Sequence, residues 1–256
     1  MVLVIRTVFG SRRVARAAVS ALFALAVSSG GGTIAAEVIG ITEPFHDVTM
    51  NCSVTGIIGA RLVQEGEFVK KGQLLIELDK KLEELDLSRK ELAREMYQSE
   101  LDRLKALSEK SAISVSREEL DKKQTEFNIA AVDLELAREQ LRKRMLTSPI
   151  DGYVTEIFVE PGEGCEPRQP ILRVVETRRC YFVANLDARS GAGLKVGQVL
   201  ALRIEGREAP VEVEGTVSYV SPVVDPASGL MRVKLTFENP DGRVRPGTSG
   251  RLILPD

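Results

Sequence analysis

The chain has 256 residues, of which 43% are apolar and 28% are charged, and its formal net charge is −2. This length suits one large domain or a few small ones, but the absence of tryptophan and the 5% of aromatic residues argue against one large aromatic-rich core. The slight negative charge argues against a nucleic-acid partner, because nucleic-acid binders present a basic surface to the phosphates.

The N-terminus is predicted to be a signal peptide, residues 1–36. A basic start precedes the apolar run 17–29, which has the length of a signal-peptide core and is short for a membrane span. Small residues follow and place cleavage near Ala36, although a retained membrane anchor stays open. The first cysteine, Cys52, lies too far downstream for a lipid anchor. The processed chain is therefore expected to be exported without a lipid. The basic residues of the segment are Arg6, Arg12, Arg13 and Arg16.

A short β-rich module occurs twice in the chain, and the copies are 96 residues apart. Residues 56–81 align without a gap on residues 152–177, with Gly56 on Gly152. In both copies apolar residues alternate with glycine turns, a pattern typical of short strands. One copy alone leaves a face uncovered, so the two are predicted to cover each other and form one small sandwich.

The segment between the two copies has the composition of helices. Glycine and proline are absent from 73 to 148, where Glu, Lys, Arg, Leu and Ala dominate. A break at 108–116 and a capping box that begins at Ser116 predict two helices, at about 80–108 and 116–146. Each helix would be about 42–45 Å long. Their short connection requires the helices to run antiparallel.

A heptad pattern marks the face that the second helix is predicted to turn toward the first. Apolar residues recur there every seven positions, and Ala130 and Ala137 follow two of them by three residues. These seam residues are Leu120, Phe127, Leu134 and Leu141. The first helix has a less regular apolar stripe, whose members are Leu82, Leu85, Leu92, Met96, Leu101, Leu104 and Leu107. Charged outer faces are expected to be solvated or to contact neighbouring hairpins, through Glu91, Arg94, Glu95, Glu135, Arg138 and Glu139.

The chain after residue 177 is predicted to be all β. Apolar segments alternate there with turn signals rich in Gly, Pro and Asp. The predicted strands are 180–186, 198–204, 211–220, 230–237 and 250–254. Residues 37–50 are expected to add a strand. Short strands in this number indicate a small barrel.

Three stretches resemble the periplasmic adaptor family, whose members are also called membrane fusion proteins or HlyD-like proteins. The stretch 66-GEFVKKGQLLIELD-79 looks like the first lipoyl half of that family, and 148-SPIDGYVTEIFVEPGE-163 looks like the second. The stretch 239-NPDGRVRPGTSGRLIL-254 is similar to its closing barrel strands. The resemblance covers nearly all of the chain after residue 36.

The resemblance implies a mixed α and β, elongated, multi-domain protein. Its parts would be a split lipoyl-like β-sandwich, or barrel-sandwich hybrid, at 51–79 and 148–177, an antiparallel α-helical coiled-coil hairpin at 80–147, and a β-barrel at 37–50 and 178–256. The chain stops at Asp256, directly after the barrel, so the further membrane-proximal domain of many relatives is not expected.

The function implied by the resemblance is non-catalytic. The chain would be the periplasmic adaptor subunit of a tripartite efflux or secretion pump, and would link an inner-membrane transporter to a TolC-like outer-membrane channel. An RND-type transporter is favoured over an ABC-type transporter, and adaptors are expected to associate into a ring. No cofactor is expected. The substrate, the number of subunits in the ring and the grip on the transporter stay open.

The predicted hairpin tip carries a pattern that many such adaptors present to a TolC-like channel. The pattern is an Arg, a Leu four residues on and a Ser seven further, here Arg103, Leu107 and Ser114. An Arg can donate a planar fork to partner carboxylates or carbonyls, and a Leu can supply an apolar contact. Ser116 fits the pattern after the loop better, so the contact serine stays open. Alternatively, the Arg is solvated, the Leu closes the hairpin core and the serines only cap helices.

Two other classes of protein fit the sequence less well. A lipoyl or biotinyl carrier pairs the same half-modules and modifies a lysine at the hairpin between them, where this chain has Lys80, but a long helical segment follows Lys80 at once. An enzyme is not expected, because His46 is the only histidine and no nucleophile–base set accompanies it.

The cysteines and the histidine support no metal site, because the chain has no CxxC and a single histidine. The three cysteines, Cys52, Cys165 and Cys180, cannot all pair within one chain. Export permits a disulfide. Small buried thiols are the favoured interpretation.

Overall fold

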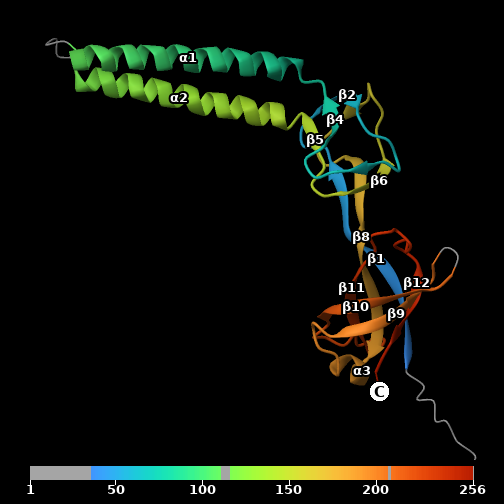
Figure 1. Cartoon of the computed structure of the whole chain (residues 1–256). Helices are drawn as coiled ribbons and strands as arrows, with labels where there is room; N and C mark the ends of the chain where they lie inside the picture. The colour runs from blue at the N-terminus through green and yellow to red at the C-terminus, as the bar shows by residue number, and fades with distance from the viewer. Residues whose placement is uncertain (1–35, 111–115, 207–208, 256) are drawn as a thin grey trace, which may run out of the picture. The chain divides into compact units, whose positions relative to one another are not determined.

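The computed structural model describes residues 36–110, 116–206 and 209–255 (Figure 1). The predicted signal peptide lies outside the described residues except for Ala36, and Ser114 lies outside them as well.

The two copies of the repeated module form equivalent strands. In the first copy these are β2 (Gly56–Arg61), β3 (Phe68–Val69) and β4 (Leu74–Leu78). In the second they are β6 (Gly152–Ile157), β7 (Gly164–Cys165) and the start of β8 (Pro170–Asp187). Each copy completes the other, because β2 pairs with β7 while β3 pairs with β6. The prediction of one sandwich built from two distant segments is confirmed.

Matching apolar positions of the two copies share one core. Ile58 is opposite Leu78 in the first copy, and Val154 is opposite Val174 in the second. All four side chains are fully buried in the same cluster, together with Leu75, Ile76, Ile171 and Leu172. Burial of a side chain of this size stabilises a fold by about 1.5–3 kcal/mol relative to exposure. Neither copy could bury these side chains alone.

Gly152→Ala is expected to destabilise the sandwich more than Gly56→Ala, although the repeat makes the two positions equivalent. A Cβ at Gly152 would lie 2.6 Å from the backbone oxygen of Val175, whereas one at Gly56 would lie 2.7 Å from the end of the Arg144 side chain and no closer than 3.4 Å to Leu78, and a side-chain end can shift more easily than backbone. We expect Gly152→Ala to lower the free energy of unfolding by about 1–3 kcal/mol and Gly56→Ala to lower it by less than about 1 kcal/mol. Urea unfolding of the purified variants measures both, and equal losses would contradict the assignment.

Helices α1 (Lys81–Lys110) and α2 (Arg117–Arg142) are inserted between the two copies, and a short strand, β5 (Met145–Thr147), follows α2. Strand β5 pairs antiparallel with β4, so the start of α1 and the end of α2 are side by side. The amide of Leu78 donates to the Arg144 carbonyl at 2.8 Å, and Arg144 Nη2 lies 2.6 Å from Glu83 Oε1. The second helix therefore ends before residue 146, where the sequence placed its end, because β5 is drawn into the sheet.

The strands after the sandwich close into a barrel. Its remaining strands are β1 (Glu37–Asn51), β9 (Val199–Ile204), β10 (Val211–Val220), β11 (Leu230–Glu238) and β12 (Ser249–Ile253). Their order is β1-β12-β9-β10-β11-β8, and pairing of β1 with β8 closes the ring. A second apolar core fills it, with Phe182, Leu202 and Leu235 fully buried. The predicted barrel is thus confirmed. The short helix α3 (Ala188–Ala192), capped by Asp187, follows β8.

Two long strands run from the barrel into the sandwich (Figure 1). Strands β1 and β8 pair from Gly40 opposite Ala184 to Asn51 opposite Pro170, with a register shift between Pro44 and His46. The limits that the sequence placed between domains, at 50/51 and 177/178, fall inside these strands. The two β units therefore share continuous hydrogen-bonded chain rather than a flexible linker.

Candidate functional site

The helical pair is the first candidate site, and its two helices run antiparallel. Lys90 Nζ donates to Asp133 Oδ2 at 2.5 Å near the sandwich, and Lys123 Nζ donates to Glu100 Oε2 at 2.8 Å farther along. As residue numbers rise along α1, the numbers of the facing residues on α2 fall, as they must for antiparallel helices. The guanidinium of Arg94 also lies over the ring of Phe127, 5.4 Å from its centroid.

The predicted seam contributes unequally to the contact between the helices. Leu134 is 5% exposed and Leu101 of α1 is 1% exposed, while Leu120, Phe127 and Leu141 are half-buried. The small side chains of Ala130 and Ala137 are buried too. Small residues beside a large one allow the two backbones to approach closely around Leu134.

Three of the four predicted tip residues lie in the described part of the chain. Arg103 and the half-exposed Leu107 are in the last two turns of α1, and Ser116 immediately precedes α2. Ser116 Oγ accepts a hydrogen bond from the amide of Glu118 at 3.2 Å, one residue before the Glu119 amide that the capping box predicts. Ser116 is thus an N-cap, whatever else it contacts. Ser114 lies outside the described residues.

Most of the apolar stripe of α1 faces solvent instead of α2. Leu82 is 78% exposed, and Leu85, Leu92 and Met96 are at least half exposed. A second exposed apolar row lies on α2, which sequence reasoning missed. Its members are Ile129, Val132 and Leu136. The spacing of three and four residues was its only signal, because a single helix with apolar residues on two faces does not reveal which face is covered.

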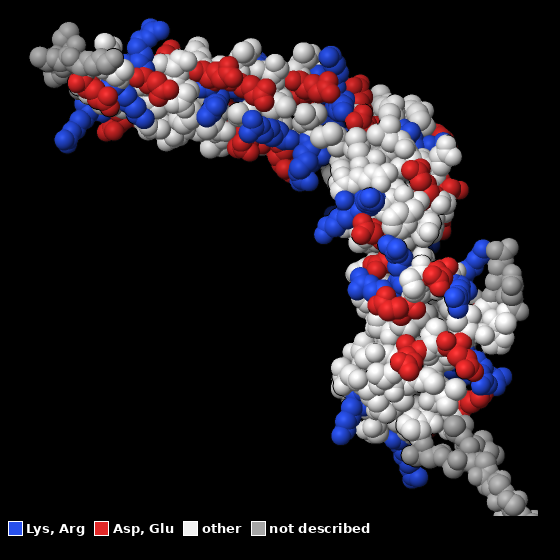
Figure 2. Space-filling view, in the orientation of Figure 1, with Lys and Arg blue, Asp and Glu red and all other residues white. Residues whose placement is uncertain are grey.

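Charged side chains along the helices pair mainly with one another. Figure 2 shows acidic and basic groups interleaved over the visible face of the pair. Arg138 Nη1 lies 2.7 Å from Glu135 Oε1, and the same guanidinium lies 3.7 Å from Glu91. Hydrogen bonds from Arg142 lower the pKa of Glu139 below its usual range. These exposed pairs each contribute little to stability and keep the outer surface polar.

Lys80, the residue that a carrier protein would modify, is engaged in ion pairs. Its Nζ donates to Glu77 Oε1 at 2.7 Å and lies 3.8 Å from Glu84 Oε1. The hydrogen bond to Glu77 raises the pKa of Lys80, so the ammonium form is favoured and the amine is a poorer nucleophile. The residue immediately precedes α1 instead of standing at a hairpin tip.

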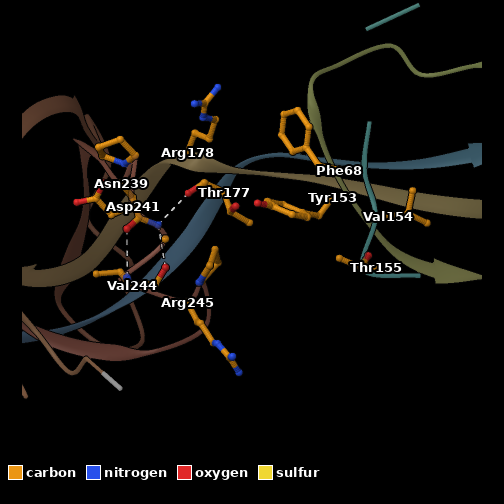
Figure 3. Close-up of a pocket in the computed structure, with 14 residues that line it drawn as sticks. Phe68, Tyr153, Val154, Thr155, Thr177, Arg178, Asn239, Asp241, Val244 and Arg245 are labelled. Atoms are coloured by element: carbon orange, nitrogen blue, oxygen red, sulfur yellow. Dashed lines mark hydrogen bonds between the residues drawn. The ribbon is translucent and has the colours of Figure 1, made fainter. Parts of the chain in front are cut away.

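A cleft of about 870 Å³ beside β8 is the second candidate site (Figure 3). Phe68 of β3 and Tyr153 of β6 line one side, with ring centroids 5.2 Å apart in an edge-to-face arrangement. Arg178 and Arg245 line the other side. Buried Asn239 holds the turn there, because its Nδ2 donates to the Thr177 carbonyl at 2.9 Å and to the Val244 carbonyl at 2.8 Å.

The chemistry of this cleft suits binding. Its aromatic edge and two guanidinium groups can accommodate an acidic or aromatic surface. In the described part of its lining the only carboxylate is that of Asp241, which lies 3.2 Å from Arg243. No nucleophile and base meet among these lining residues.

His46, the single histidine, lies at the register shift between β1 and β8. Its Nδ1 is 2.7 Å from Glu176 Oε2, and Arg179 donates to the other oxygen of that carboxylate at 2.9 Å. Burial acts to raise the pKa of Glu176, but the two hydrogen bonds outweigh it and lower the pKa. Across residues 36–110, 116–206 and 209–255, no three His, Cys, Asp or Glu side chains gather as metal ligands. None of the helices in those ranges is both long and apolar enough to span a membrane.

A sandwich split by two antiparallel helices and joined to a six-stranded barrel defines a class of protein, the membrane fusion proteins. The family model described as RND MFP, barrel-sandwich hybrid domain, matches residues 46–177. The model described as CusB-like, beta-barrel domain, matches residues 184–255. The chain belongs to the membrane fusion protein family of RND systems, as its resemblance to periplasmic adaptors predicted.

Relatives of the chain include named components of efflux pumps. The solvent efflux pump periplasmic linker SrpA of Pseudomonas putida is 24% identical over 243 residues, which cover 88% of this chain and 62% of SrpA. Multidrug resistance protein MexA of Pseudomonas aeruginosa is 26% identical over 235 residues, covering 84% of this chain and 59% of MexA. The chain thus spans less than two thirds of the length of these relatives.

A solved structure shares the fold. It is the crystal structure of a MacA–MexA chimeric protein that contains the α-hairpin domain of Pseudomonas aeruginosa MexA. The TM-score is 0.73 at 23% identity, and the match covers 86% of this chain and 79% of the chimera.

Proposed function

We propose that this protein is the periplasmic adaptor of a tripartite efflux pump, which links an RND-type inner-membrane transporter to a TolC-like outer-membrane channel. The observation that carries the proposal is the helical pair inserted between the two halves of the sandwich. About 45 Å of α1 separates the sandwich from the end where Arg103 and Leu107 are exposed. A protein that must reach a second membrane component needs such a projecting element.

The proposed mechanism is mechanical, and no bond is made or broken. The sandwich and barrel would pack beside their copies in a ring, and the helical pairs would carry the tip residues to the channel. The seam around Leu134 and Leu101 would stiffen each pair, so that a force on the tip is transmitted to the sandwich. The strands shared by the sandwich and the barrel, β1 and β8, would pass that force on to the barrel.

Co-purification of the membrane partners tests the proposal. A tagged full-length chain, expressed in its own host and extracted with mild detergent, is expected to retain a proton-driven RND transporter and an outer-membrane channel, identified by mass spectrometry. An unrelated exported protein with the same tag is the control. Retention of an ABC-type transporter would correct the transporter class. Retention of no membrane protein beyond the control would contradict the proposal.

A further inference from the structure

Two of the three cysteines meet in the core of the sandwich. Cys52 follows β1 and Cys165 ends β7, and both are almost fully buried in the same cluster. Cys52 Sγ lies 2.9 Å from the carbonyl oxygen of Val54, and Cys165 Sγ lies 3.8 Å from that same oxygen. Two sulfur atoms at these distances from one oxygen lie within about 7 Å of each other.

The backbones that carry the two thiols are held on neighbouring segments. The amide of Cys52 donates to the Gln169 carbonyl at 2.9 Å, and the amide of Arg168 donates to the Cys52 carbonyl at 3.0 Å. Cys165 is opposite Gly56 in the pairing of β2 with β7. A disulfide requires two segments that are already adjacent, because it tolerates little backbone movement.

The internal repeat supplies an independent comparison. At the equivalent place in the other half, Ser148 and Val69 stand where Cys52 and Cys165 stand here. Ser148 makes the matching contacts, since its Oγ donates to the Ile150 carbonyl at 2.6 Å and its amide donates to the Gln73 carbonyl at 2.9 Å. The sandwich fold therefore does not require cysteine at these two positions. A pair of thiols occurs at only one of the two equivalent sites.

We propose that Cys52 and Cys165 form a disulfide when the chain is exported, which ties the first half of the sandwich to the second. Each thiol loses a proton, and the pair gives up two electrons to the reactive disulfide of a periplasmic thiol oxidase, which leaves as its dithiol. One thiolate attacks the oxidase disulfide, and the second thiolate then displaces the oxidase from the mixed disulfide. The oxidising compartment rests on the proposed function, but the pairing of the two residues does not.

The bond would close a loop that contains both helices. Burial and the neighbouring Cys52 thiol raise the pKa of Cys165 to about 12, so the folded dithiol reacts slowly and the bond is expected to form before the sandwich closes. A loop of about 110 residues is held shut by such a bond, so the halves of the sandwich stay joined when the helices are displaced. Cys180 takes no part, since it is buried in the other core.

The test is a disulfide map of the full-length chain. The protein is refolded with oxidised glutathione, then blocked with an alkylating reagent in denaturant, so that buried thiols react as well, and digested without reductant. Mass spectrometry is expected to find the Cys52 peptide joined to the Cys165 peptide and Cys180 alkylated. The same link is expected in protein recovered from the periplasm. Reduction of the wild-type protein should lower its melting temperature by about 10 °C.

Each outcome has one meaning. Cys52→Ser and Cys165→Ser should both remove the link and the effect of reductant, whereas Cys180→Ser should keep both. The wild-type comparison needs no substitution, so a variant that misfolds does not obscure the result. Three alkylated cysteines after oxidative refolding would overturn the pairing. A link formed on refolding but missing from the exported protein would overturn its formation in the cell and leave the adaptor function to the co-purification test.

Discussion

Replacement of Arg103 and Leu107 by alanine together is expected to abolish efflux while leaving the protein folded. Both side chains are exposed at the end of α1 farthest from the sandwich, so truncation removes surface that a partner can contact and almost no core. The free energy of unfolding should change by no more than about 0.5 kcal/mol, as for other surface substitutions. Accumulation of a fluorescent dye in cells that lack the wild-type gene should rise to the level of the deletion strain.

A matched control separates the tip from the rest of the helix. Leu85 and Arg89 are the same residue types, also four apart on α1, but they lie near the sandwich and are exposed. The Leu85→Ala and Arg89→Ala pair should retain efflux. Normal efflux in the tip variant would refute its docking role and leave Arg103 and Leu107 as ordinary helix surface. Ser116→Ala, tested separately, would show whether the N-cap serine also contacts the channel.

Leu134→Ala, unlike the tip substitutions, is expected to lower the stability of the helical pair. Its side chain is buried where α2 packs on α1, beside Ala130 and Ala137, so truncation leaves a cavity between two helices that are already close. The expected cost is about 2–4 kcal/mol. Thermal unfolding followed by far-ultraviolet circular dichroism should show the helical signal lost at a lower temperature. Efflux should also fall, because a less stable helical pair does not keep the tip residues in position.

Leu136→Ala is the matched control for this experiment. It makes the same substitution two residues along the same helix, but Leu136 is 58% exposed, so truncation should cost less than about 0.5 kcal/mol. If Leu134→Ala and Leu136→Ala lower the melting temperature equally, the buried seam is wrongly assigned. If neither does, the helical pair derives its stability from elsewhere, such as the ion pairs between Lys90 and Asp133 and between Lys123 and Glu100.

The architecture could be predicted because its signals are local or repeated. The 96-residue offset between Gly56 and Gly152 is a property of the string of residues, and it predicts two equivalent sets of strands before any contact is known. The helical segment is predicted by its composition and by the lack of glycine and proline from 73 to 148. Strands β9 to β12 lie between turn signals that depend on a few adjacent residues.

The residues of the candidate sites could be predicted only in part from the sequence pattern. The heptad spacing selected Leu134 and the Ala130 and Ala137 row, which are buried, but it could not rank them above Leu120 or Leu141. The cleft of Phe68, Tyr153 and Arg178 had no signal at all, because its walls come from strands far apart in the chain. Only pairing of β3 with β6 brings the two rings together.

The repeated halves, the two helices and the strands of the barrel could be predicted from the residues alone, because periodicity, turn residues and composition act over a few neighbouring positions. Only the folded chain shows which apolar faces are covered, that α2 ends at Arg142 so that β5 can pair with β4, and that Cys52 and Cys165 lie close to each other. Those outcomes depend on residues that are tens to more than a hundred positions apart in the chain. No local pattern predicts these contacts, because the pattern of each half-module does not depend on which residues of the other half pack against it.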